Sequence, residues 1–118
     1  MDNDLLIKQS DLDALENNQS RGIELGSLAI FLIRKNNQFF VYHNRCPHVG
    51  VRLDWQPHQF LAADANLIQC SMHGALFTIE SGLCVAGPCQ QQSLTAIDFS
   101  PTPQGLKLNK AQCLSLID

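Results

Sequence analysis

Two short motifs of cysteine and histidine constrain this chain more than any other feature. They are Cys46-Pro47-His48 and Cys70-Ser71-Met72-His73, and 21 residues separate them. Each motif supplies one thiol and one imidazole, which zinc and iron-sulfur clusters both accept as ligands. Gly50 and Gly74 follow the two motifs, and a residue without a side chain lets a loop approach a bound group closely. The pattern predicts that the rest of the chain is a scaffold for two metal-binding loops.

The order of the ligands bears on the kind of metal site. In the usual zinc fingers, two cysteines come from one element and two histidines from another. Here each motif mixes one cysteine with one histidine. A binuclear cluster accounts for this order, because one iron can take both thiolates and the other both imidazoles, with each loop reaching across both metals. A zinc-stabilised structural or interaction module without redox function stays open as the alternative.

At these residues the chain resembles the Rieske [2Fe-2S] domain family. The resemblance rests on Cys46-Pro47-His48-Val49-Gly50 and Cys70-Ser71-Met72-His73-Gly74. Downstream, Gly82 and Gly87-Pro88 match the usual ending of the family's domain. The resemblance extends over about residues 27–100, and the pairing of the two motifs is highly specific.

The resemblance implies one cofactor, a single [2Fe-2S] cluster per chain. Its four implied ligands are Cys46, His48, Cys70 and His73. The residues implied to lie in the cluster loops or beside the ligands are Pro47, Gly50, Met72, Gly74, Ala75, Phe77 and Pro88. Of these, Pro88 would belong to a third loop that covers the cluster.

The mixed ligand set raises the reduction potential. Two ferric ions, two sulfides, two thiolates and two neutral imidazoles sum to zero charge, so reduction costs less than in a four-thiolate cluster. High-potential members of the family direct a serine hydroxyl at a sulfide and a tyrosine hydroxyl at a thiolate. The matching residues here are Ala75 and Phe77, and the positions of those members' loop disulfide are Val51 and Met72. The resemblance therefore implies the low-potential, disulfide-free class.

Short β-branched and aromatic runs predict an all-β protein. Residues 28–33 and 39–42 are expected to form a hairpin around Asn36-Asn37, since asparagine tolerates a positive φ. Further strands are expected at residues 5–7, 23–25, 67–69, 75–79, 83–85, 94–99, 106–108 (as an edge strand) and 113–117. Residues 17–22 and 100–105 are expected to be turns, and residues 11–15 a helical turn capped by Ser10 or Asp11.

These elements predict one fold for the whole chain. It is a Rieske-like antiparallel β barrel or sandwich, with a small cluster-binding subdomain of two hairpin loops at about residues 44–90. The domain is expected to be single and to span residues 1–118. Of the other cysteines, Cys84 is expected to be a small core residue, and the roles of Cys89 and Cys113 stay open.

Composition excludes several classes of function. The net charge is -3 and no block of like charges occurs, which argues against binding to nucleic acid. The longest apolar run, residues 28–33, is far shorter than the ~20 residues that span a bilayer. The N-terminus has acids where a secretory signal needs positive charge, and the five cysteines are an odd number. We therefore expect a cytoplasmic protein with no membrane anchor.

The expected function is one-electron transfer without catalysis. Outside the two motifs, the sequence has no nucleophile paired with a base, no phosphate loop and no nucleotide-binding motif, and a chain of 118 residues lacks room for an oxygenase domain. The resemblance implies a flavin-containing reductase and an oxygenase component as partners, with the outer edges of His48 and His73 as the electron exit. An alternative is the small Rieske-like subunit of a nitrite-reductase-type enzyme.

Overall fold

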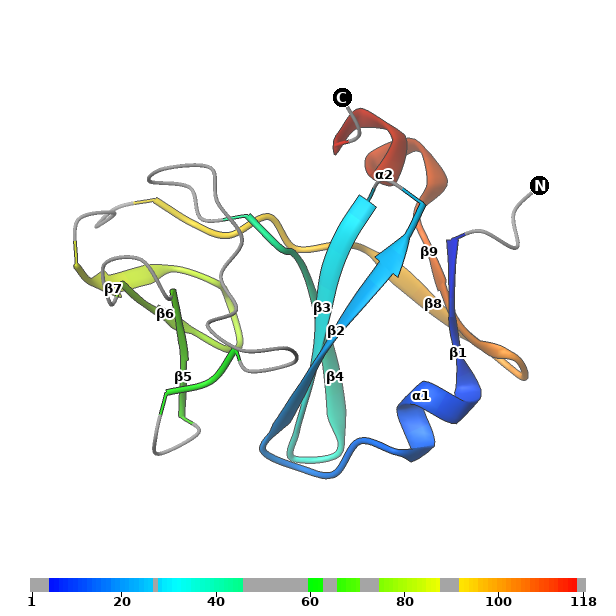
Figure 1. Ribbon diagram of the computed structural model, residues 1–118, viewed down its shortest axis with the longest axis horizontal. Helices are drawn as coiled ribbons and strands as arrows, with labels where there is room; N and C mark the ends of the chain where they lie inside the picture. The colour runs from blue at the N-terminus through cyan, green and yellow to red at the C-terminus, as the bar shows by residue number, and fades with distance from the viewer. Residues whose placement is uncertain are drawn as a thin grey trace.

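The computed structural model describes residues 5–26, 28–45, 60–62, 66–70, 75–87 and 92–116. These residues form nine strands and two short helices, in the order β1 (Leu6–Lys8), α1 (Gln9–Asp13), β2 (Gln19–Leu25), β3 (Leu28–Lys35), β4 (Gln38–His43), β5 (Leu67–Gln69), β6 (Leu76–Thr78), β7 (Cys84–Ala86), β8 (Phe99–Thr102), β9 (Gly105–Leu108) and α2 (Lys110–Leu116). The strands make three antiparallel sheets of three strands each, ordered β1-β9-β8, β2-β3-β4 and β5-β6-β7 (Figure 1). The predicted all-β class is confirmed.

The predicted hairpin of β3 and β4 is confirmed. Asn36 and Asn37 form its two-residue turn, with φ of 53° and 62°, and the strands pair directly on either side at Lys35 and Gln38. Two positive φ values in succession match the twist of the flanking strands, and asparagine adopts them at low cost. The turn fixes the register that carries β4 toward the first cysteine motif.

The middle sheet, β2-β3-β4, separates two hydrophobic cores. Successive side chains of a strand point to opposite faces. Accordingly, Phe31 and Ile33 belong to a first core shared with the β5-β6-β7 sheet. Ile30 and Leu32 belong to a second core shared with the β1-β9-β8 sheet and α2. The fold therefore has three layers, visible from left to right in Figure 1.

Residues 92–98 connect these layers, and the prediction of a strand over residues 94–99 is wrong except at its last residue, Phe99, which opens β8. The backbone bonds of this segment are divided between two sheets. Cys84 N–H donates to the Gln92 carbonyl and Leu94 N–H to the Gly82 carbonyl, both at 2.9 Å, on the β7 side. His43 N–H donates to the Thr95 carbonyl at 2.9 Å and Ile97 N–H to the Val41 carbonyl at 2.8 Å, on the β4 side. A segment that changes partners after two residues extends neither ladder.

The C-terminal strand predicted over residues 113–117 is wrong, because this stretch lies in helix α2 apart from residue 117, which is outside the described residues. Asn109 caps the helix, since its side-chain oxygen accepts a 2.9 Å bond from the Gln112 N–H. The first helical bond runs from the Cys113 N–H to the Asn109 carbonyl. Cys113 is fully buried in the second core. A capped helix with one buried residue, Cys113, is therefore found where a strand was expected.

Three other predictions need correction. Strand β9 confirms a strand at residues 106–108, but it lies in the middle of its sheet and not at the edge. Helix α1 begins at Gln9 after Lys8, which makes no side-chain cap bond, so neither Ser10 nor Asp11 is the cap. The stretches expected to be turns at residues 17–22 and 100–105 lie largely in β2 and in β8 and β9. Pairing with a neighbouring strand overrides the polar composition of the first stretch and the proline-rich composition of the second.

Tyr42 ties the first core together, because its buried hydroxyl donates a hydrogen bond to the Ile79 carbonyl beyond β6. Tyr42→Phe is expected to lower the free energy of unfolding by about 1–2 kcal/mol, since that carbonyl loses its partner. Burial, and then the Glu80 carboxylate, raise the Tyr42 pKa from 10.0 to about 12. The folded state thus favours the protonated phenol, so this contribution is complete below pH 10 and is lost as the pH rises through 12.

Urea titrations of both proteins at neutral and at alkaline pH check this prediction. Wild type should lose stability relative to Tyr42→Phe between pH 10 and 12. Equal stability of the two proteins at neutral pH would contradict a structural role for the hydroxyl.

Neither helix in the described ranges is long and apolar enough to cross a membrane.

Candidate metal centre

One of the four predicted ligands, Cys70, lies among the described residues. The other three, Cys46, His48 and His73, lie outside them. The same holds for the loop residues Pro47, Gly50, Val51, Met72, Gly74 and Pro88. The predicted centre is therefore described through the elements that lead into and out of each loop.

Cys70 follows directly on β5, as expected of a ligand delivered by a strand. Its N–H donates a 2.9 Å hydrogen bond to the carbonyl of Ala75, the residue before β6. The β5–β6 pairing therefore continues one step past the strands, and the chain leaves and rejoins it at these two residues. Cys70 is buried at 1% exposure in the first core. A buried thiol at the mouth of a tight hairpin is rigidly placed, which metal binding requires.

The approach to the first motif is also held by hydrogen bonds. Strand β4 ends at His43, whose N–H donates to the Thr95 carbonyl at 2.9 Å. Asn44 is buried at 6% exposure, and its N–H donates to the Ala29 carbonyl at 2.9 Å. The Arg45 N–H turns back onto the His43 carbonyl. The chain is thus fixed up to the residue that precedes Cys46.

Gly87, the residue before the third predicted loop, lies against Ala75, the residue after the second. Gly87 has a φ of +98°, and a Cβ atom placed on it would lie 2.8 Å from Cα and 3.1 Å from Cβ of Ala75. Real Cβ atoms do not approach carbon so closely, so the contact requires glycine here. The residue before Pro88 therefore touches the residue that closes the second loop. This close approach, together with the mixed thiol and imidazole donors of the sequence, fits a cluster enclosed by three loops.

The side chains behind Cys70 are apolar. Ala75 and Phe77 are buried at 1% and 0% exposure in the same core and carry no polar atom. Cys84 is also in this core, and its thiol donates to the Ala86 carbonyl at 3.2 Å, as expected of a structural cysteine. Cys113 lies in the other core, where burial raises the pKa of its thiol. Neither thiol is a rival to Cys70 as a ligand.

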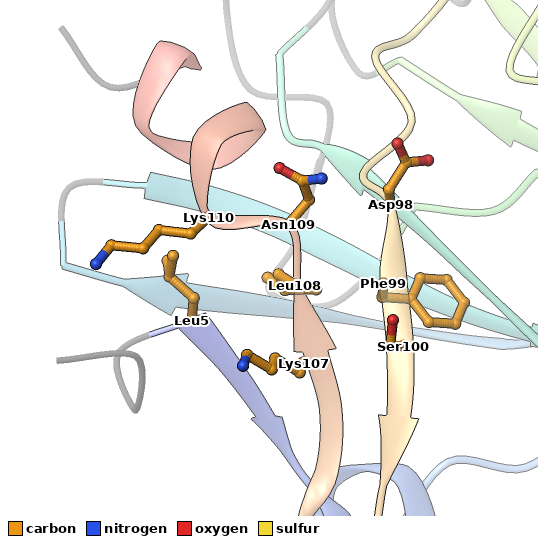
Figure 2. Close-up of a pocket in the computed structure, with 8 residues that line it drawn as sticks. All are labelled: Leu5, Asp98, Phe99, Ser100, Lys107, Leu108, Asn109 and Lys110. Carbon is orange, nitrogen blue, oxygen red and sulfur yellow. The ribbon is translucent and has the colours of Figure 1, made fainter.

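A surface hollow of about 400 Å³ lies on the β1-β9-β8 sheet, which packs against the second core. It is lined by residues of β8 and β9, by Leu5, and by Asn109 and Lys110 at the start of α2 (Figure 2). Cys70, the one predicted ligand that the structure describes, does not line it. The hollow therefore belongs to the scaffold and not to the metal centre.

These features define an antiparallel β protein in which β4 and β5 lead toward the two cysteine-histidine motifs of the sequence, and Cys70 lies in a buried apolar core. Residues 5–108 match the family model of the Rieske [2Fe-2S] domain, and the chain belongs to this family. The family binds one [2Fe-2S] cluster per domain, so the predicted cofactor is confirmed. Family membership also decides between the two metal sites left open by the motifs, in favour of the cluster over zinc.

Similar proteins include both long and short chains. Apoptosis-inducing factor 3 of Mus musculus and of Homo sapiens are each 34% identical over 68 residues, which is 58% of this chain. The chain spans about a tenth of the length of these curated relatives, because the match covers 10% of each.

Two solved ferredoxins share the fold. The ferredoxin of carbazole 1,9a-dioxygenase from Nocardioides aromaticivorans IC177 has a TM-score of 0.65 at 19% identity, over 87% of this chain and 92% of that one. The Sphingomonas yanoikuyae B1 ferredoxin has a TM-score of 0.67 at 19% identity, over 89% and 95%. At these identities the likeness confirms the Rieske-like fold and leaves the function to other arguments.

Sequence reasoning did not find the contact between Gly87 and Ala75. The only sequence signal for this contact was Gly87-Pro88, which matched the usual ending of the family's domain. It did not indicate which residue the glycine contacts. The role of Tyr42 in joining two sheets was also missed, since its sequence context is that of any strand residue.

Proposed function

We propose that this protein is a low-potential one-electron carrier, which takes electrons from a flavin-containing reductase and passes them to an oxygenase or a similar terminal component. A bound [2Fe-2S] cluster supplies a centre that accepts and donates one electron at a time. The proposed ligands are Cys46, His48, Cys70 and His73, within a cluster-binding subdomain at about residues 44–90 of a single domain. The observation that supports a low potential is that the side chains of Ala75 and Phe77 carry no hydrogen-bond donor.

The argument for a low potential rests on what these two residues lack. Hydrogen bonds to the sulfurs stabilise the reduced, more negative cluster and raise its potential within a range of roughly -150 to +300 mV. Ala75 pairs with the ligand Cys70, and Phe77 lies two residues further along in the same core. Both are buried and neither side chain can donate. We therefore expect a midpoint potential in the lower part of the range.

An oxygenase partner is supported by one of the solved structures that share this fold. One similar structure is a complex of reduced oxygenase and oxidized ferredoxin in carbazole 1,9a-dioxygenase, with a TM-score of 0.64 at 19% identity. In that system a Rieske-type fold and an oxygenase form a complex. The same transfer is proposed for this chain, in the cytoplasm, with the reductase as the upstream donor and no nucleic acid or membrane as a partner.

Potentiometric titration followed by electron-spin resonance tests the proposal. The purified protein should be red-brown, its reduced form should have a mean g below the free-electron value, and its midpoint should lie below about +100 mV. Ala75→Ser should raise the midpoint by roughly 40 mV, since a net hydrogen bond is worth about 1 kcal/mol and 59 mV corresponds to tenfold in a one-electron equilibrium.

Ala111→Ser is a matched control, because Ala111 lies on α2, which packs against the second core and not the first, and should leave the midpoint unchanged. A colourless protein with stoichiometric zinc would contradict the cofactor, and a wild-type midpoint above about +100 mV would contradict the low-potential class.

A permanently bound subunit of a larger reductase, of the nitrite-reductase type, is the second candidate. It is favoured by the curated relatives, in which the matched region is a small part of a much longer chain. Gel filtration alone and beside the products of adjoining genes separates the two. A carrier elutes by itself, whereas a subunit elutes in a stable complex.

A further inference from the structure

The second half of the connecting segment, residues 95–98, has backbone groups on two sides. In an extended chain, alternate residues direct their N–H and C=O groups to opposite sides. One side faces β4. The Thr95 carbonyl accepts a hydrogen bond from the His43 N–H at 2.9 Å, and the Ile97 N–H donates to the Val41 carbonyl at 2.8 Å. The groups on the opposite side therefore need other partners.

Gln112 on α2 supplies partners on that side. Its side-chain Oε1 accepts a 2.8 Å hydrogen bond from the Asp98 N–H, and its Nε2 donates a 2.6 Å bond to the Ala96 carbonyl. The amide acts as a neighbouring strand would, because it offers one acceptor and one donor to the backbone. The Asn109 N–H adds a third bond, to the Asp98 carbonyl at 2.8 Å. The start of α2 therefore holds the segment against β4.

The backbone that carries the Gln112 amide is itself fixed. The Gln112 N–H donates to the side-chain Oδ1 of Asn109 at 2.9 Å, which is the bond that caps α2. The next residue, Cys113, is fully buried in the second core. A side chain can hold a second segment in one position only if its own backbone is held, and both neighbouring contacts provide this.

The connecting segment contacts two strands that lead to the predicted cluster loops. Its first half bonds to β7 and to the turn before it, and β7 leads to Gly87. Its second half bonds to His43 at the end of β4, three residues before Cys46. In Figure 1 the segment runs as a yellow trace from the side of β7 to β8. Movement of residues 92–98 would therefore shift the two approaches relative to each other.

We propose that Gln112 is a positioning residue for the [2Fe-2S] cluster, although its helix packs against the second core. By holding residues 95–98 against β4, it fixes the chain that enters the first motif relative to the chain that enters the third predicted loop. The inference rests on the proposed function, because the first motif supplies two of the proposed ligands. Without the amide, two backbone groups of the segment are left to water, and the two approaches move more freely.

Hydrogen exchange with mass spectrometry tests the first step, from Gln112 to β4. In Gln112→Ala with its cluster bound, peptides covering residues 39–45 and 92–98 should exchange about fivefold faster than in wild type, the factor that one net hydrogen bond is worth. Cys113→Ala is the matched control, because it weakens the second core from the same helix and keeps the amide. It should leave residues 39–45 unchanged. Faster exchange confined to α2 in Gln112→Ala would overturn the proposal.

The cluster itself reports the second step. The spin-resonance lines of reduced Gln112→Ala should be broader than in wild type, since the cluster is held in a wider range of geometries, and its visible absorbance should fade about fivefold faster under air. Ser115→Ala removes a different exposed bond of α2, from the Ser115 hydroxyl to the Gln112 carbonyl, and should change neither property. Wild-type lines and lifetime in Gln112→Ala, or equal changes in Cys113→Ala, would overturn the proposal.

The wild-type signal separates failure of this inference from failure of the proposed function. A wild-type protein without a cluster signal defeats the proposed function and this inference with it. A normal wild-type cluster that Gln112→Ala leaves unchanged defeats only the positioning role. Should Gln112→Ala fail to fold, Gln112→Glu replaces it, because a carboxylate keeps the acceptor for the Asp98 N–H and lacks the donor for the Ala96 carbonyl. Unchanged lines and lifetime in that variant count equally against the proposal.

Discussion

Cys70→Ser is expected to abolish cluster binding. Cys70 is buried at the mouth of the β5–β6 hairpin, where its N–H is bonded to the Ala75 carbonyl. A thiolate is a soft ligand for iron, and a serine hydroxyl at this place is a poor substitute. Iron and sulfide analysis should give less than about a tenth of the wild-type content, and the spin-resonance signal of the reduced protein should be lost.

Cys84→Ser is the matched control for this variant. Cys84 is buried in the same first core, and its thiol donates to the Ala86 carbonyl, which a serine hydroxyl can also do. Cys84→Ser should therefore keep its cluster with a normal signal. A fully loaded Cys70→Ser protein, or loss of the cluster in both variants, would remove Cys70 from the proposed ligands.

Gly87→Ala is expected to lower both the free energy of unfolding and the retention of the cluster. Its φ of +98° is strained for any residue with a side chain, and the new Cβ would lie 2.8 Å from Cα of Ala75. The strain costs about 1–3 kcal/mol, and the contact forces the backbone at residue 87 away from Ala75. Urea titration should show the lower stability, and the visible absorbance should fade several times faster under air than in wild type.

Gly26→Ala separates the two causes. Gly26 also has a positive φ, of +64°, but a Cβ atom there would meet nothing within 4 Å. This variant should lose only the backbone contribution of about 1–2 kcal/mol and keep the wild-type rate of absorbance loss. Equal behaviour of the two variants would mean that the contact with Ala75 does not help to retain the cluster.

Features that depend on neighbouring residues could be predicted from the sequence. The turn at Asn36-Asn37 follows from the tolerance of asparagine for positive φ, and its flanking runs are long enough to reveal their period. The position of Cys70 after a short strand follows from the apolar residues before it. These predictions needed no knowledge of which strands become neighbours.

Features that depend on distant pairing could not be predicted in the same way. Residues 92–98 look like a strand, but their hydrogen bonds go to two different sheets. Strand β9 alternates as an edge strand would, yet β1 and β8 from opposite ends of the chain flank it. Helix α2 is a different case. The cap at Asn109 is a local signal for a helix, but the short apolar run after it was interpreted as a strand.

The candidate site also combines features that could be predicted from the sequence with features that could not. The motif and the family resemblance identified the ligand types, and Ala75 and Phe77 could be aligned with them residue by residue. The contact of Gly87 with Ala75 depends on how β7 pairs with β6, where the register shifts by one residue between Leu76 and Phe77. A bulge of this kind redirects the following residues, and nothing in the local sequence specifies it.

The position of β3 between two cores has a consequence for the life of the protein without its cofactor. Phe31 and Ile33 stabilise the cluster side, whereas Ile30 and Leu32 stabilise the opposite side together with β1, β9 and α2. Regions with separate sets of buried contacts open as separate cooperative units. Loss of iron would loosen the first unit and leave the second folded, with β3 still in place as a template. The apoprotein would then begin maturation with the second unit already folded. Iron insertion would need to order only the first unit, on the cluster side.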